Sequence, residues 1–157
     1  MALTPAQKVT LKAAIQADST ANSFYTDGDL GGLAAYYNAP ASPAFTVWKS
    51  LVPWPIVGDK INATELVGLT TGKLTQLQTL ALISPTGINP SITDRRDALD
   101  QIFSAASGTI TRPALLILWK RLATRLEKVF ATGTGSDASP ATLVVEGTLS
   151  TSDLIGL

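Results

Sequence analysis

A long apolar stripe in the second half of the chain is the feature that most restricts its fold. From Thr111 to about Ala131, large apolar side chains recur at intervals of three and four residues, which places them on one face of an α-helix. The stripe consists of Leu115, Leu118, Trp119, Leu122, Leu126, Val129 and Phe130. Because a face about five turns long needs other helices to cover it, we expect a helical bundle with this helix at its centre.

Helix-start signals precede several other segments. Thr4, Pro5 and Gln7 form a capping box with proline at the first helical position, which predicts a helix over 5–17. Asp29 is placed to cap a short helix that begins at Leu30. Further helices are expected at 43–51, after Ser42 and Pro43, and at 64–69, after the capping pair Asn62 and Glu65. Two more are expected at 72–83 and 93–106, and an irregular connection at 52–59.

The composition changes abruptly after residue 131. Residues 132–141 are almost entirely Gly, Ser, Thr, Ala, Asp and Pro, which is typical of a flexible linker. The β-branched run Thr142, Leu143, Val144, Val145 and Glu146 then predicts a short strand. This strand either adds to the edge of a partner sheet or folds back as a local hairpin with 148–150. The expected fold is therefore mainly α, with a helical bundle domain over 1–131 and a linker and flexible C-terminal arm over 132–157 that contains one short β-strand.

The overall composition favours a protein that assembles with others. Only 15% of the residues are charged, against a usual quarter, and interface cores are depleted in charge. Twelve basic residues balance twelve acidic ones, so no net field attracts nucleic acid or an anionic membrane. Cysteine is absent, and neither a signal peptide nor an apolar run of about 20 residues is found. We expect a soluble protein without a membrane partner that is cytoplasmic when made.

The sequence lacks the residues that most catalytic sites use. Without histidine or cysteine, the common nucleophilic systems and the commonest transition-metal ligand are missing. The segment 68–74 has the wrong glycine spacing for a phosphate-binding loop, and 27–38 has Asn38 where a calcium loop needs a bidentate glutamate. Asp94, Asp97 and Asp100 fit the favoured acidic first turns of a helix. We expect no enzyme activity, no catalytic residue, no cofactor and no metal.

One charge pattern is uneven. The segment 111–131 holds five basic residues against one acidic residue, a net charge of +4, while the rest of the chain carries −4. On a continuous helix, Arg121, Arg125 and Lys128 share one face beside Lys120. This face is either a solvated helix surface or a contact for an acidic partner or for DNA. No aromatic residues alternate with the basic ones to stack bases, which argues against sequence-specific nucleic-acid recognition.

Three segments of the chain resemble a family of tailed-bacteriophage structural proteins involved in head and tail morphogenesis. They are Leu3–Gln7, the stretch from Asn38 to Trp48 that reads NAPASPAFTVW, and the tail from Ala123 through Gly147. The similarity covers the two ends of the chain, whereas 49–91 looks like a variable region. In its overall organisation, a helical body followed by a C-terminal arm, the chain is most similar to helical head-to-tail adaptors.

The resemblance implies a virion protein at the head–tail junction. Such an adaptor forms a homo-oligomeric ring, typically of twelve copies, between the portal protein and the tail or neck proteins. The resemblance also implies that the arm residues 142–146 bind the portal. It further implies that a basic face, formed by Lys120, Arg121, Arg125 and Lys128, contacts an acidic neighbour or DNA in the channel. The alternatives are another phage structural protein, capsid-associated or from the tail, and a small DNA-binding helical factor.

Overall fold

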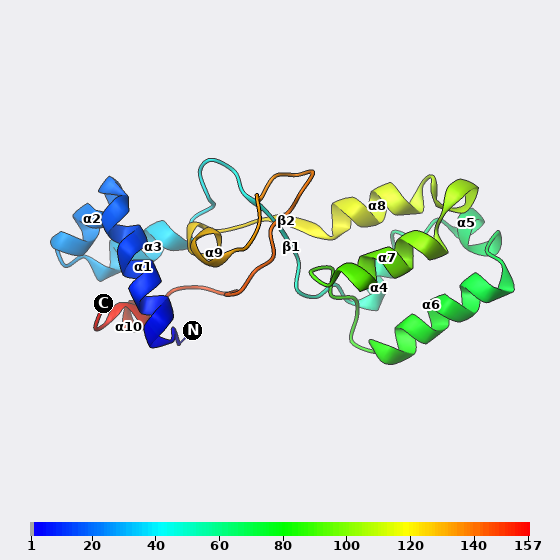
Figure 1. Ribbon diagram of the computed structural model, residues 1–157, viewed down its shortest axis with the longest axis horizontal. Coiled ribbons are helices and arrows are strands. Elements are labelled where there is room, and N and C mark those ends of the chain that lie inside the picture. The colour runs from blue at the N-terminus through cyan, green and yellow to red at the C-terminus, as the bar shows by residue number, and fades with distance from the viewer. Residues whose placement is uncertain (1) are drawn as a thin grey trace. The chain divides into compact units, whose positions relative to one another are not determined.

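The computed structural model describes residues 2–157 and divides them into two compact units (Figure 1). Unit 1 combines the N-terminal part of the chain, up to Val47, with Leu122–Leu157, and unit 2 consists of Trp48–Arg121. Both units are built mainly from helices, so the mainly-α fold class predicted from the sequence is confirmed. The two units do not follow the predicted division into a bundle over 1–131 and an arm over 132–157.

Unit 1 gathers helices from both ends of the chain. They are α1 (Pro5–Ala17), α2 (Ser19–Thr26), α3 (Leu30–Asn38), α9 (Arg125–Phe130) and α10 (Thr151–Leu154). Both predicted starts are confirmed: Thr4 and Gln7 form the capping box of α1, and the Asp29 carboxylate accepts from the Gly32 amide in α3. The sequence reasoning missed α2, which Asp18 caps through the amides of Thr20 and Ala21. The core of this unit includes Leu11, Ile15, Leu33, Leu126 and Leu154.

Unit 2 is a second helical body with its own core. Its elements are α4 (Trp54–Gly58), α5 (Ala63–Val67), α6 (Thr71–Ile83), α7 (Thr93–Ile102), the 3₁₀-helix η1 (Ala105–Gly108) and α8 (Thr111–Leu118). The capping of α5 by Asn62 and the predicted helix at 72–83 are confirmed. The region 52–59, expected to be irregular, contains α4. The core holds Ile88, Leu99, Ile102, Phe103, Leu115 and Trp119.

The long helix predicted over 111–131 is wrong. It is replaced by α8, the strand β2 (Lys120–Leu122) and α9, and Thr124 with Glu127 forms a new capping box at the start of α9. The physical reason is that the apolar stripe serves two cores: Leu115 and Leu118 pack in unit 2, whereas Leu126 packs in unit 1. A single unbroken helix cannot pack one apolar stripe into two separate cores.

The helix predicted over 43–51 is also wrong, because this stretch contains the strand β1 (Thr46–Trp48). β1 pairs with β2 in a two-stranded sheet, and the chain leaves unit 1 through β1 and returns through β2. The Ser42–Pro43 pair resembles a helix start locally, but Phe45 and Val47 pack instead with Ala123 and Ala141 in a small separate core of unit 1.

The C-terminal segment is folded onto unit 1 and is not a free arm. Four of its apolar side chains are buried, namely Ala141, Val145, Leu149 and Leu154. The strand expected at 142–146 is not formed: Ala141 makes an isolated parallel bridge with Val47, and Thr142 an isolated antiparallel bridge with Thr132. The linker predicted over 132–141 also lies against unit 1, because the Thr46 amide donates to the Gly135 carbonyl at 2.7 Å and the Ala141 amide donates to the Thr46 carbonyl at 3.0 Å.

Among the described residues 2–157, no helix is both long enough and apolar enough to cross a membrane.

Candidate partner-binding surfaces

The predicted portal-binding residues 142–146 alternate between inward and outward positions. The Thr142 amide and carbonyl exchange two hydrogen bonds of 2.9 Å with Thr132. Leu143 is half-buried in the small core around Val47, and Val145 is buried in the main core of unit 1. Thr142, Val144 and Glu146 are exposed, with Val144 68% accessible. The outward side chains are thus the ones that a partner can reach without unfolding the segment.

The rest of the C-terminal segment is fixed by polar contacts with the first helices. The side-chain amide of Asn38 donates to the Leu149 carbonyl and accepts from the Leu149 amide, both at 2.8 Å. Ser150 and Asp153 form the capping box of α10, and the hydrogen bonds from Ser150 lower the pKa of Asp153. The two hydrogen bonds between Asn38 and Leu149 join residues 111 positions apart in the chain.

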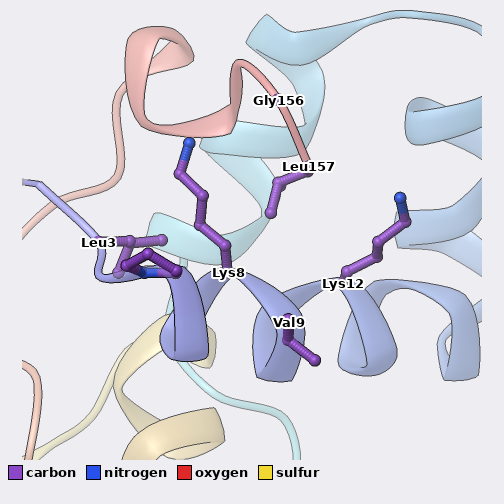
Figure 2. A pocket seen from close by; sticks show the side chains of 7 residues that line it. Leu3, Lys8, Val9, Lys12, Gly156 and Leu157 are labelled. Carbon is purple, nitrogen blue, oxygen red and sulfur yellow. The ribbon is translucent and has the colours of Figure 1, made fainter.

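The end of the segment lies over α1 beside an open cavity of about 410 Å³ (Figure 2). In Figure 2 the Lys8 side chain points toward the chain around α10, and its Nζ donates to the Ile155 carbonyl at 2.6 Å. The Tyr25 hydroxyl donates to the Leu157 carbonyl at 3.0 Å. The cavity is lined by Leu3, Pro5, Lys8, Val9, Lys12, Gly156 and Leu157. Its walls are formed by the two terminal regions of unit 1, so they depend on the docked segment.

Arg125, one of the predicted partner-facing residues, is engaged inside unit 1. Its guanidinium lies 4.1 Å from the centre of the Tyr36 ring, and Nη1 donates to the Tyr36 carbonyl at 3.0 Å. The Arg125 backbone amide donates to the Ala39 carbonyl at 2.9 Å. A cation at the C-terminal end of a helix is favoured, and here it stabilises the end of α3.

Tyr36 connects Arg125 to Asp18. Its hydroxyl donates to Asp18 Oδ2 at 2.7 Å. This hydrogen bond lowers the pKa of Asp18 and raises that of Tyr36. Burial is the main cause that raises the pKa of the neighbouring Tyr37 to about 12. A cavity of about 270 Å³ opens beside these groups, and Lys128 also lines it. The sequence reasoning missed this cluster, because its members come from three separate stretches of chain.

The four predicted basic residues do not lie on one helix. Lys120 and Arg121 lie half-exposed on β2, whereas Arg125 and Lys128 lie on α9. The Lys128 Nζ is 5.7 Å from the centre of the Phe45 ring. The helical spacing that grouped these residues is interrupted at Trp119, so the single helical stripe expected from the sequence is not formed.

A buried carboxylate connects two helices of unit 2. Glu65 of α5 accepts from the amides of Ile110 and Thr111, each at 2.8 Å, and from the Thr109 hydroxyl at 3.0 Å. Burial alone would raise its pKa, but these hydrogen bonds outweigh the burial and lower the pKa to about 2. The sequence identified Glu65 only as part of a local cap. Its structural role is to hold the start of α8.

Large apolar side chains are concentrated on the surface of unit 2. Thirteen are exposed in the described part of the chain, and nine of these belong to unit 2. They are Leu51, Ile56, Val67, Leu82, Ile83, Ile92, Ile110, Leu116 and Ile117. Single exposed leucines are ordinary, but a concentration on one small unit is typical of an interaction surface.

In residues 2–157, no cluster of three or more acidic side chains is placed to hold a metal ion. Comparisons of the chain with family models, with curated proteins and with solved structures found no match.

Proposed function

We propose that this chain is a structural subunit of a tailed-phage virion, a head-to-tail adaptor that assembles into a ring between the portal and the tail. It works through binding surfaces and carries out no reaction. The resemblance in Leu3–Gln7, in the stretch from Asn38 to Trp48 and in the tail after Ala123 supports the phage context.

The observation that carries the proposal is the weakly charged surface of the helices α6 and α8 in unit 2, with its exposed aliphatic side chains. Each of the helices α6 and α8 has one charged residue, and each of these is bonded within the unit: Lys73 donates to Ser104 at 2.8 Å, and Arg112 pairs with Asp100 at 3.1 Å. Surfaces with exposed aliphatic side chains and few free charges resemble the cores of protein–protein interfaces. A subunit of an assembly needs such surfaces, and an isolated protein gains nothing from them.

The portal contact is proposed for the exposed side chains of the docked C-terminal segment. Thr142, Val144 and Glu146 face outward while Val145 anchors the same stretch in the core. A partner therefore meets a prearranged surface and does not have to order a flexible chain, which reduces the entropic cost of binding. The half-exposed Lys120 and Arg121 are proposed to face an acidic neighbour or channel DNA.

The test is to add the purified full chain to portal rings and to image the product. We expect a second ring layer on the portal. Val144→Asp should weaken this docking without unfolding the chain, because the side chain is 68% exposed. Val9→Asp is the matched control, since Val9 is 72% exposed on α1 and is not one of the residues 142–146.

Portal rings that remain bare in the presence of the full chain would contradict the adaptor proposal. Tight, salt-dependent DNA binding by the isolated chain, lost in an Arg121→Glu variant, would favour the alternative of a DNA-binding factor.

A further inference from the structure

The outer surface of α6 carries no free charge. Its exposed positions hold Thr, Gly, Gln, Leu and Ile, and its single charged residue, Lys73, is bonded to Ser104. Its inner side packs Leu74, Leu77 and Leu80 into the core of unit 2, while Leu82 and Ile83 are 80% and 58% exposed. The C-terminal end of α6 therefore exposes large aliphatic side chains in addition to those that it packs in the core.

A groove runs beside this surface, between α6 and α7. It has a volume of about 340 Å³, and it is lined by Thr75, Gln76, Thr79, Leu80, Ile83, Arg95, Ala98, Gln101 and Ile102. The floor is aliphatic, and the edges carry amide and hydroxyl groups with Arg95 as the one charged lining residue. An apolar floor with mostly uncharged polar edges is the form of site that receives the apolar face of a helix.

The exposed face of α8 has the complementary form. Ile110, Pro113, Ala114 and Ile117 follow the i, i+3, i+4, i+7 spacing of groove-binding helices, and Leu116 adjoins them. Ile117 is 73% exposed, and Ile110 and Leu116 are about half exposed. This stripe contains no charged residue, and the adjacent Arg112 is already paired with Asp100.

The two surfaces also agree in length. Ile110 and Ile117 are seven residues apart, which corresponds to about 10 Å along a helix. The groove is lined on one side from Thr75 to Ile83, eight residues apart, and on the other from Arg95 to Ile102, seven residues apart. The anchors of α8 are therefore about as long as the lining of the groove.

The groove and the stripe lie on opposite flanks of α7. Arg95, Ala98 and Ile102 face the groove, whereas Asp100, about half a turn away from them around the helix, faces Arg112 of α8. Figure 1 shows the same order within unit 2, with α7 between α6 and α8. A chain therefore cannot place its own α8 in its own groove.

We propose that the α6–α7 groove of one copy binds the exposed face of α8 from a second copy, in a head-to-tail contact. The proposal rests on the subunit role stated above and names the contact that builds the assembly. Because the two patches differ, each bound copy still offers a free groove at one end and a free stripe at the other, so the contact propagates until a ring closes. The stripe contains no charged residue and the groove only Arg95, so the two patches fit each other better than they fit nucleic acid, which needs several cations.

The test mixes two variants of the full chain, each blocked on one patch. Ile117→Glu places a charge on the stripe and leaves the groove intact, and Ile83→Glu does the reverse; both side chains are exposed, so circular dichroism should match the wild type. By sedimentation velocity, the wild type should form large assemblies, each variant alone should be a monomer, and the equimolar mixture should form dimers and nothing larger. Val67→Glu, at an 86% exposed position outside both patches, should assemble like the wild type.

Three results would overturn the proposal: a wild type that stays monomeric at its highest soluble concentration, single variants that assemble like the wild type, or a mixture that remains monomeric. A wild type that assembles as proposed but leaves portal rings bare would instead contradict the adaptor function and keep the head-to-tail contact.

Discussion

Glu65 is the residue on which the arrangement of unit 2 most depends. Its carboxylate satisfies the first backbone amides of α8, which have no partner within that helix. It thereby connects α5 to a helix that begins more than 40 residues later. The same helix carries the proposed stripe, so the position of the stripe depends on this single ionised group.

We predict that unit 2 loses stability in acid because of Glu65. Its pKa is about 2 in the folded state, below the ordinary value of 4.5, so the folded state binds the proton less readily than the unfolded state. The stabilisation is complete above pH 4.5 and is lost as the pH falls from there toward 2. Urea denaturation followed by the fluorescence of Trp54 and Trp119 at several pH values measures this loss.

The variant Glu65→Gln supplies the control for this pH dependence. It keeps the shape of the side chain but lacks the charge, so it should be less stable than the wild type at pH 7 and should show a weaker acid dependence. Equal stability of variant and wild type at pH 7 would show that the carboxylate does not hold α8.

Arg125 is predicted to stabilise unit 1. Replacement by alanine removes the stacking on Tyr36 and the hydrogen bond to its carbonyl, which together should cost about 1–2 kcal/mol of unfolding free energy. Lys128→Ala, which loses only a distant contact with the Phe45 ring, should cost less. Chemical denaturation compares the two variants. An Arg125→Ala chain of unchanged stability that fails to bind portal rings would restore the partner-facing role expected from the sequence.

At the scale of elements, the C-terminal segment is part of the fold of unit 1. Its apolar side chains occupy the same core as α1 and α3, and Asn38 holds the Leu149 backbone from both sides. The segment therefore contributes to stability as well as to any partner contact. Its removal would leave the core of unit 1 open to water.

We predict that Leu149→Ala lowers the unfolding free energy of unit 1 by roughly 2–4 kcal/mol, because the side chain is 3% exposed and leaves a cavity. The exposed neighbour in the same segment gives the comparison: Val144→Ala should change stability by less than about 0.5 kcal/mol. Thermal or urea unfolding of the full chain measures both. Similar small effects for the two variants would mean that the segment is not packed in solution.

The elements that could be predicted from the sequence are those whose signals are local. The starts at Thr4, Asp29 and Asn62 depend on side chains that bond backbone amides two or three residues away, and all three are confirmed. The break after Leu118 could not be foreseen, because the apolar spacing continues across it while the side chains enter different cores. β1 and the docking of the C-terminal segment depend on partners far along the chain.

The candidate surfaces show the same difference between local signals, which the sequence reveals, and long-range contacts, which it does not. The sequence singled out Arg125 and Lys128 from their spacing, but it gave no sign of Tyr36 and Phe45, which are distant in the chain and hold them. The groove between α6 and α7 was missed, since only the packing of the two helices creates it. The low charge of the chain was the one sequence signal that pointed to interfaces, and it could not locate them.

At the scale of the whole molecule, the two units have different surfaces. Unit 1 combines both ends of the chain and presents the docked C-terminal segment, whereas unit 2 holds most of the exposed aliphatic side chains. We propose a division of labour in which unit 2 makes the contacts between copies and unit 1 meets the portal. Two surface variants should then have different effects. Ile117→Glu should abolish self-assembly, whereas Val144→Asp should weaken portal docking and leave self-assembly intact.

Hydrogen–deuterium exchange of the full chain at low and high protein concentration tests the assembly of unit 2 most directly. Amides of α6, α7 and α8 should become protected as the concentration rises, while those of α1, α2 and α10 in unit 1 should exchange at an unchanged rate. Protection confined to unit 1, or no change with concentration anywhere, would contradict the account.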